Sequence, residues 1–456
     1  MLVAGLDVGG SSVKAWVQEV GGALRASVTV PTTTLRSGDR AEFDPAAWES
    51  ACRTALSRAV EGLTGPWLGL TVSSLRQGFV LLDGSGSPVG QGVVNSDRRG
   101  AGFTGVLEGQ HGLTGHWPAP ELTLPKLLAI RSQEPERWAA ASRLLFVHDW
   151  LVWLLTGEQV TEVSYACAGG MANVEARTWA TDLLTSAEVP TSLLATLAEA
   201  GTTVGPLRNG WALPAGTPVV TGCGDTQLAV MGAGGLAPGV VTVVAGSSTP
   251  VAAATGSPVQ DPLGRPWVST HAAPDLWMAE GNAGYPGTFS GWWNAVADSA
   301  QQDDPGGVIA VTAVELWSQP TWEVRPPWSL LGLRPDTTAG QVRRALLEAH
   351  AFSVAAAVDD LARVLGPATE VVITGGAAAD GALPSLLATV LDRDVVWDQA
   401  PSAAAAGTAL VRRAAGEACE APELPQKRCS AGDPGALAER RVVWEQAVGT
   451  LREGFA

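Results

Sequence analysis

The chain has 456 residues, of which 46% are hydrophobic and 16% are charged, so it can bury the cores of two or three domains and is not a disordered chain. Its formal net charge of −16 disfavours nucleic acid or an anionic membrane as a partner, although a local pocket could still bind an anion. The N-terminus lacks the features of a signal peptide, and no apolar run is long enough for a membrane span. We therefore expect a cytoplasmic protein.

The cysteines show no pairing pattern. No CxxC motif occurs, which argues against both a disulfide framework and a zinc site. We expect reduced structural thiols at Cys52, Cys167, Cys223, Cys419 and Cys429.

The first half of the chain alternates predicted strands and helices. A Gly/Ser turn separates two strands at residues 2–8 and 13–20. Asp44 and Pro45 suit the start of a helix over residues 44–63. A buried strand at residues 67–73, a hairpin over 79–94 and a mostly helical region over 121–200 follow. This alternation predicts the α/β class.

The second half repeats the alternation. Predicted strands cover residues 217–221, 240–245, 250–254 and 370–374, and helices cover 227–234, 339–365 and 433–455. A strand–AGSST–strand segment near residue 247 resembles the strand–GGSSV–strand segment near residue 10. This echo predicts two similar domains; coincidence in a Gly/Ser-rich chain is the alternative.

Gly/Ser hairpin tips suit phosphate, because glycine lets backbone N–H groups approach and serine adds donors. The P-loop, the GxGxxG fingerprint, the protein-kinase motifs and the GxSxG elbow are absent. Asp7 ends a strand beside the first tip and suits a water-mediated magnesium ligand, or else caps a turn; Lys14 is near enough to reach a phosphate. Asp225 stands between a predicted strand and a predicted helix. Its carboxylate is either open to a ligand or caps the N-terminus of the helix.

The ordered motifs resemble the FGGY carbohydrate kinases, of the actin and hexokinase ATPase superfamily. The two phosphate motifs are similar to DVGGSSVK (residues 7–14) and VVAGSSTP (243–250). The segment that carries the catalytic aspartate is similar to TGCGDTQLAVMGAG (221–234). The adenosine motif is similar to VVITGGAAADGALPSLLATVL (371–391), which follows a helix, ALLEAHAFSVAAAVDDL (345–361), that also fits the family pattern.

The resemblance implies two actin-like (ribonuclease H-like) domains around a cleft, with residues 1–235 on the sugar side and residues 236–456 on the nucleotide side. It also implies phosphoryl transfer from ATP to a sugar or polyol. Asp225 is then the catalytic base and also contacts the substrate, and Asp7 binds Mg²⁺ through water. The implied ATP-binding residues are Gly10, Ser11, Ser12, Lys14, Gly246, Ser247, Ser248, Gly375, Gly376 and Asp380. Gly10 and Asp380 depart from the family pattern, and we expect activity to survive both departures.

The resemblance assigns substrate reading to Arg76 and Gln77 in SSLRQG (residues 73–78) and to Asp97 in NSDRR (95–99). Pairing of Arg76 with a surface carboxylate such as Asp97, without a ligand, is the alternative. A ketopentose such as xylulose is the leading acceptor, although Arg76 and Gln77 depart from the xylulose kinase pattern. The alternatives are an autoinducer-2 kinase, a glycerol or tetritol kinase, and a non-catalytic sugar sensor of the same fold. A homodimer is left open.

Overall fold

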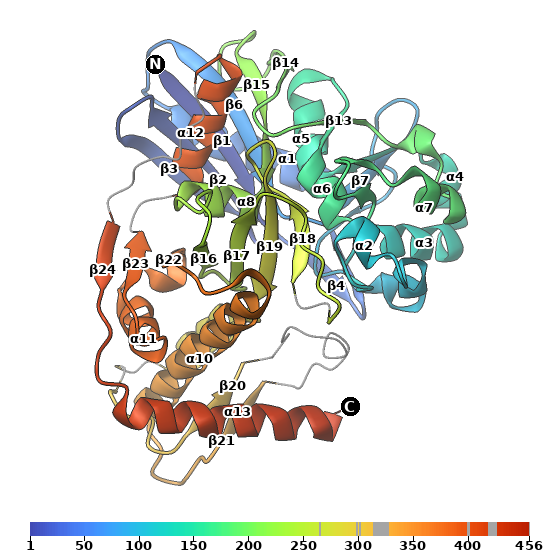
Figure 1. Ribbon diagram of the computed structural model, residues 1–456. Coiled ribbons are helices and arrows are strands. Elements are labelled where there is room, and N and C mark those ends of the chain that lie inside the picture. The colour runs from blue at the N-terminus through green and yellow to red at the C-terminus, as the bar shows by residue number, and fades with distance from the viewer. Residues whose placement is uncertain are drawn as a thin grey trace.

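The computed structural model describes residues 1–263, 266–297, 300, 302–312, 328–398, 402–417 and 426–455. Two sheets lie one above the other in Figure 1, with the N-terminal half at the top. The cysteines within the described ranges are free, and Cys419 lies outside those ranges. None of the helices described is both long and apolar enough to cross a bilayer.

The first sheet has the strand order β14-β15-β6-β1-β2-β3. Its strands are β1 (Leu2–Val8), β2 (Ser12–Glu19), β3 (Leu24–Pro31), β6 (Trp67–Ser74), β14 (Thr203–Pro206) and β15 (Pro218–Gly224). Strands β1, β6 and β15 are parallel, so their carboxyl ends meet at one edge. Such an edge is where open α/β sheets bind ligands.

Helices cover both faces of this sheet, which explains why β1 is buried along nearly its whole length. On one face lie α1 (Pro45–Val60) and α5 (Val147–Thr156). Asp44 caps α1 as expected, accepting a hydrogen bond from the Ala46 amide at 2.9 Å. The other face packs against α12 (Ser402–Ala414), which returns from the far end of the chain.

The second sheet repeats the arrangement, with the order β18-β19-β17-β16-β22-β23-β24. Its strands are β16 (Val240–Val244), β17 (Pro250–Thr255), β18 (Trp267–Thr270), β19 (Trp277–Asn282), β22 (Glu370–Thr374), β23 (Val395–Asp398) and β24 (Gln426–Cys429). In both sheets the central strand has an antiparallel hairpin on one side and parallel strands on the other. Two similarly built sheets are therefore present, as expected. The bounds 1–235 and 236–456 stay a prediction, and α12 from the second range packs on the first sheet.

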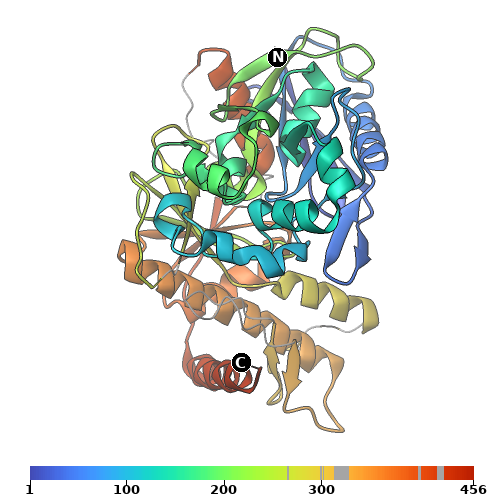
Figure 2. The same cartoon turned by 90° about the vertical axis from the view of Figure 1, so that its right-hand side faces the viewer.

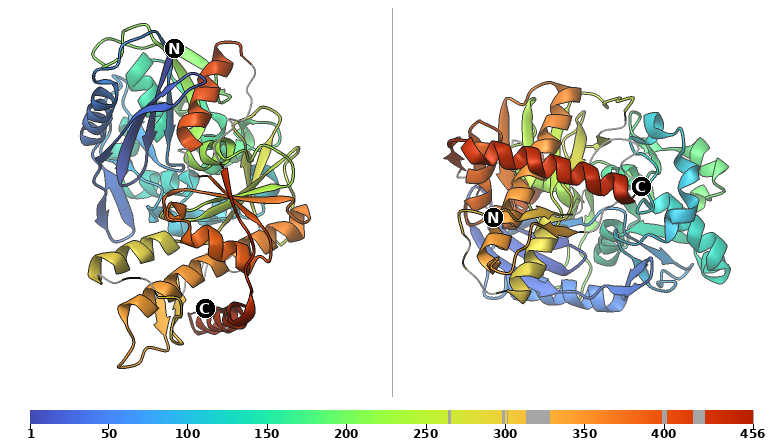
Figure 3. Two further views of the ribbon diagram at one scale, coloured as in Figure 1. Left: turned by 90° about the vertical axis from the view of Figure 1, so that its left-hand side faces the viewer. Right: turned by 90° about the horizontal axis from the view of Figure 1, so that it is seen from below.

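Helices α10 (Ala339–Leu365) and α11 (Ala382–Val390) pack on the second sheet, and α9 (Pro286–Val296) and α13 (Gly435–Phe455) pack on α10. The bounds of α10 are those predicted from its apolar spacing. A two-stranded sheet, β20 (Ile309–Val311) with β21 (Ser329–Leu331), packs beside α10. Figure 3 shows α13 crossing the underside of this domain. The chain links the two sheets through α8 (Asp225–Gly232). The 3-10 helix η3 (Gly376–Ala378) lies between β22 and α11.

A smaller unit lies beside the first sheet (Figure 2). Its five-stranded sheet contains β4 (Leu35–Ser37), β5 (Arg40–Phe43), β7 (Phe79–Leu82), β8 (Gly92–Val93) and β9 (Arg143–Phe146). Its helices are η1 (Arg99–Leu107), α2 (His111–Thr114), α3 (Thr123–Gln133), α4 (Pro135–Ala140), α6 (Val163–Ala168), α7 (Thr181–Ser186) and η2 (Thr191–Leu193). The region expected to be mostly helical also contains short strands: β9, β10 (Val160–Glu162), β11 (Ala172–Asn173), β12 (Thr178–Trp179) and β13 (Thr196–Ala198).

Candidate active site

The carboxyl end of β1 places Asp7 beside a hydroxyl and an ammonium group. Asp7 lies opposite Lys14 in β2 and opposite Ser73 in β6. The Ser73 hydroxyl donates to Asp7 Oδ1 at 2.9 Å. Burial raises the pKa of Asp7, while the Ser73 hydrogen bond and the Lys14 charge act in the opposite direction. Carboxylate and hydroxyl oxygens are ligands that Mg²⁺ accepts, so this corner of the sheet fits the ion.

Asp225 follows β15 directly and begins α8. The N-cap position belongs to Gly224, so capping is not the role of Asp225. The Asp225 carboxylate accepts a hydrogen bond from the Thr226 amide at 2.8 Å, and 45% of its side chain is exposed. Withdrawal from bulk water raises its pKa to about 6, against the lowering effect of Arg76 and with a smaller raising effect of Asp7. A carboxylate with this pKa suits a general base near neutral pH.

Arg76 is held by a carboxylate from the other domain. Its two terminal nitrogens donate to both oxygens of Glu280 in β19, at 2.5 and 2.7 Å. Its Nε lies 3.7 Å from Asp225 Oδ1. Arg76 does pair with a carboxylate, as the alternative expected, but the partner is the buried Glu280, and Asp97 pairs with Arg99 instead. Glu280 was not predicted, although a single acidic residue in an otherwise uncharged strand, WMAEGN, is the signal that could have found it.

Arg76 and Asp225 line a cavity of about 270 Å³ between the two domains. Gln77 and Ser248 also line it, so four of the predicted site residues share one space. Three further lining residues, Asn95, Ser96 and Arg98, belong to the NSDRR segment that the resemblance places at the substrate. The sequence interpretation missed the other polar and aromatic lining residues, namely Glu121, Thr226, Trp267, Glu280, Asn282 and Tyr285.

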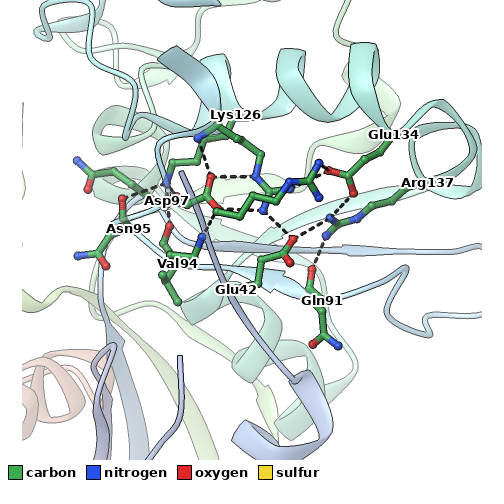
Figure 4. A network of polar contacts seen from close by, with 12 residues as sticks. Glu42, Gln91, Val94, Asn95, Asp97, Lys126, Glu134 and Arg137 are labelled. Carbon is green, nitrogen blue, oxygen red and sulfur yellow. Dashed lines mark hydrogen bonds and ion pairs between the residues drawn. The ribbon is translucent and has the colours of Figure 1, made fainter. Parts of the chain in front are cut away.

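The structure does not bring Asp97 to this cavity. Its side chain is fully buried, and both carboxylate oxygens accept hydrogen bonds from Arg99. Oδ2 also accepts from the Ala41 amide at 2.6 Å. Arg99 also donates hydrogen bonds to Glu42 and Glu134, which extend this polar network (Figure 4). The expectation that Asp97 grips substrate hydroxyls does not fit, because a buried carboxylate is retained where such partners neutralise it.

A buried lysine fixes two loops of the cavity wall (Figure 4). Lys126 Nζ donates to the carbonyls of Gln77, Val94 and Asn95 at 3.2, 2.9 and 3.2 Å. Gln77 itself adopts a left-handed backbone with φ 64°, an uncommon conformation that this bond helps to hold. Burial lowers the pKa of Lys126 to about 7. The lone lysine in the apolar segment TLPKLLAI was the available signal.

The two Gly/Ser tips close in similar ways. The Gly9 amide donates to Ser12 O at 2.9 Å in the first, and the Gly246 amide donates to Ser248 O at 3.0 Å in the second. These turns leave Ser11 exposed, while Gly10, Ser12, Ser247 and the neighbouring Lys14 are also accessible or half-buried. Backbone and hydroxyl donors of this kind suit phosphate oxygens.

The loop after β22 lies directly against the second tip. A Cβ on Gly375, whose φ is 105°, would lie 2.4 Å from Ala245 O, so only glycine permits this approach. Gly376 begins η3. Asp380 accepts a hydrogen bond from the Ala382 amide at 3.0 Å and thereby fixes the start of α11. The structure thus places two of the three segments predicted to bind ATP, residues 243–250 and 371–391, against each other. Their contacts with a nucleotide stay predictions.

Comparison with known proteins identifies the family. Residues 2–232 match the model described as "FGGY family of carbohydrate kinases, N-terminal domain". Residues 237–415 match that described as "FGGY family of carbohydrate kinases, C-terminal domain". The chain belongs to the FGGY family of carbohydrate kinases.

Individual FGGY relatives are distant. YoaC of Bacillus subtilis (strain 168), named as a sugar kinase, is 28% identical over 292 residues, which span 62% of this chain and 59% of YoaC. An autoinducer-2 kinase of Salmonella paratyphi B is 26% identical over 448 residues, which span 89% of this chain and 84% of that protein. The crystal structure of xylulose kinase from Rhodospirillum rubrum has a TM-score of 0.83 at 24% identity, with 100% of both chains covered.

These FGGY matches confirm the kinase prediction and the two-domain actin-like fold. The chain is a sugar or polyol kinase, and membership of the family implies use of ATP. Both family models describe carbohydrate kinases, which does not support the alternative of a non-catalytic sugar sensor. The individual site residues and the acceptor are matters for proposal.

Proposed function

We propose that this FGGY kinase transfers the γ-phosphate of ATP to a hydroxyl of a small neutral sugar, with a ketopentose such as xylulose as the leading acceptor. One observation carries the proposal: Asp225, with a pKa raised to about 6, lies in the interdomain cavity beside the Arg76 guanidinium. Glu280 takes one N–H from each terminal nitrogen of Arg76, so each of these nitrogens keeps a second N–H for a ligand. A base and these donors in one cavity suit an acceptor that loses a proton while its oxygens are held.

Each group has a defined task in this proposal. Asp225 accepts the proton of the attacking hydroxyl. Arg76 and Gln77 hold the other sugar oxygens, since both residues line the same cavity as Asp225. Phosphate oxygens bind at the tips, through Gly10, Ser11 and Ser12, with Lys14, and through Gly246, Ser247 and Ser248. Adenosine lies against Gly375 and Gly376, with Asp380 nearby.

Asp7, with Ser73 bonded to it, would hold Mg²⁺ through water. The ion would neutralise charge on the phosphates, which is most of what phosphoryl transfer requires. Among the described residues there is no group of three or more His, Cys, Asp or Glu side chains that could hold a metal ion.

The charges around the cavity support a neutral acceptor. Glu280 neutralises Arg76, and Glu121 lies 2.6 Å from Arg98. Among the lining residues given above, Asp225 is then the remaining charge, so a carboxylate-bearing sugar acid would meet net repulsion.

Autoinducer-2 is the second candidate, because the match to autoinducer-2 kinase extends over 448 residues. The deciding experiment measures ADP release with ATP, Mg²⁺ and one acceptor at a time: xylulose, ribulose, glycerol, erythritol, autoinducer-2 and gluconate. Asp225→Asn is the matched control. We expect kcat/KM to be highest for xylulose; a preference for autoinducer-2 supports the second candidate. Stimulation by gluconate alone contradicts the neutral-acceptor proposal.

A further inference from the structure

One peptide group next to Asp225 is held by two neighbouring side chains. It is the peptide that joins Cys223 to Gly224. Its carbonyl accepts a hydrogen bond from the Tyr165 hydroxyl at 2.8 Å, and its amide donates to Ser164 Oγ at 3.2 Å. Both partners lie on α6, so both polar groups of one peptide plane are bound by a single short helix.

This peptide lies where the ladder between β6 and β15 is interrupted. Pairing is regular through Thr221 and Val72, shifts, and returns only at Gly224 opposite Ser74. The Tyr165 hydroxyl enters this irregularity, because it also accepts a hydrogen bond from the Ser74 amide at 2.9 Å. One phenol thus joins the end of β6, two residues before Arg76, to the end of β15, two residues before Asp225.

The clamp is itself rigidly supported. Tyr165 is fully buried, and its ring stacks on His148 with centroids 4.8 Å apart. Burial raises the pKa of the Tyr165 hydroxyl well above its usual value, so it stays protonated and can donate. The Ser164 hydroxyl donates to Glu162, which also caps α6 through the Ser164 amide. Glu162 lies at the end of β10, so the support reaches outside α6.

We propose that Tyr165 and Ser164 are positioning residues that fix the plane of the Cys223–Gly224 peptide and so aim the Asp225 carboxylate at the acceptor hydroxyl. The inference rests on the proposed role of Asp225. A fixed peptide directly before a base matters, because a shift of about 1 Å at reacting atoms can cost about 10²-fold in rate. The competing explanation is that these bonds only close the sheet.

The first test does not depend on activity. Amide hydrogen exchange is compared in the full chain for the parent, Tyr165→Phe, Ser164→Ala and a control, Thr221→Val. Thr221 is buried in the same strand and loses two comparable bonds, to the Thr202 amide and to Glu199 O. Tyr165→Phe removes the acceptor of the Ser74 amide, so faster exchange at Ser74 is expected with or without a clamp. Faster exchange at Gly224, by about tenfold or more, is therefore the diagnostic result. Unchanged exchange at Gly224 overturns the clamp.

The second test measures steady-state kinetics of the same variants with the acceptor that the parent uses. Tyr165→Phe and Ser164→Ala should lower kcat about tenfold to a hundredfold and leave both KM values within about threefold. Thr221→Val should retain kcat. Equal losses of kcat in Thr221→Val, or parental kcat in Tyr165→Phe, overturn the positioning role.

These tests separate the two proposals. If the parent shows no acceptor-dependent turnover, the proposed function fails, and the clamp is judged by hydrogen exchange alone. If Tyr165→Phe does not fold, Ser164→Ala, which retains the phenol, is judged by the same two criteria.

Discussion

Arg76 and Glu280 form a bidentate ion pair across the interdomain cavity, although 204 positions separate them in the chain. Only 11% of the Arg76 side chain and 6% of the Glu280 side chain are exposed. Because Glu280 occupies both terminal nitrogens, Nε is the part of the guanidinium that faces Asp225. The pair therefore links the loop after β6 in the first domain to β19 of the second.

Removal of Arg76 should affect stability and acceptor kinetics separately. Arg76→Met leaves Glu280 buried without a partner, which should cost about 3–5 kcal/mol of unfolding free energy. It should also lower kcat/KM for the sugar by an amount that corresponds to about 1–3 kcal/mol of lost transition-state stabilisation. The double variant Arg76→Met/Glu280→Met should recover stability in urea unfolding and not the sugar kinetics. Recovery of both would make the pair purely structural.

Turnover should depend on ionisation of Asp225. A general base works deprotonated, so a pKa of about 6 predicts that kcat falls tenfold per pH unit below that value. Asp225→Asn should lower kcat by about 10²- to 10⁴-fold with little change in ATP binding. A pH–rate profile between pH 5 and pH 8 checks the first expectation, and a flat profile would remove Asp225 as the base.

Asp7→Asn should raise the Mg²⁺ concentration needed for half-maximal turnover, because an amide is a weaker ligand than a carboxylate. The matched control is Asp83→Asn, a carboxylate in an exposed turn where it accepts from the amides of Ser85 and Ser87. Magnesium titrations of parent, variant and control provide the comparison. If the Asp7→Asn curve overlays that of the parent, Asp7 does not hold the ion.

Lys126→Met should weaken acceptor binding through the loops that the ammonium holds. Each buried carbonyl left without a donor costs about 1–3 kcal/mol, so urea unfolding should show a clear loss of stability. The KM for the sugar should rise while the KM for ATP stays near that of the parent. Lys427→Met, at a cation–π contact with Trp397, is the control. Equal changes in both KM values would indicate a general loosening instead.

Glu162 should make stability depend on pH. Burial raises its pKa from 4.5 to about 8, so the folded chain keeps a proton that the unfolded chain releases. The contribution is complete below pH 4.5 and is lost as pH rises through 8. Glu162→Gln keeps an acceptor for α6 and cannot ionise, so its Tm should fall less than that of the parent between pH 5 and pH 9. Parallel Tm curves would contradict this.

Local patterns in the sequence determined much of the fold and part of the site. The apolar spacing of residues 339–365 predicted α10 with its observed bounds, and Asp44 marked the start of α1. The two Gly/Ser tips and the strand ends at Asp7 and Asp225 were also found, because turns, caps and buried strands depend mainly on neighbouring residues.

Partnerships between distant segments were decided only by the tertiary structure. Arg76 pairs with Glu280 and not with Asp97, and Asp97 is enclosed by Arg99. Neither Lys126 nor Tyr165 was singled out, since each acts through carbonyls and amides that carry no mark in the sequence. Strand register and the packing of one domain on the other determine which buried polar groups meet. A buried polar group must find such a partner or lose its hydration without compensation. The sequence indicates that a partner is needed, but it does not show which residue the partner is.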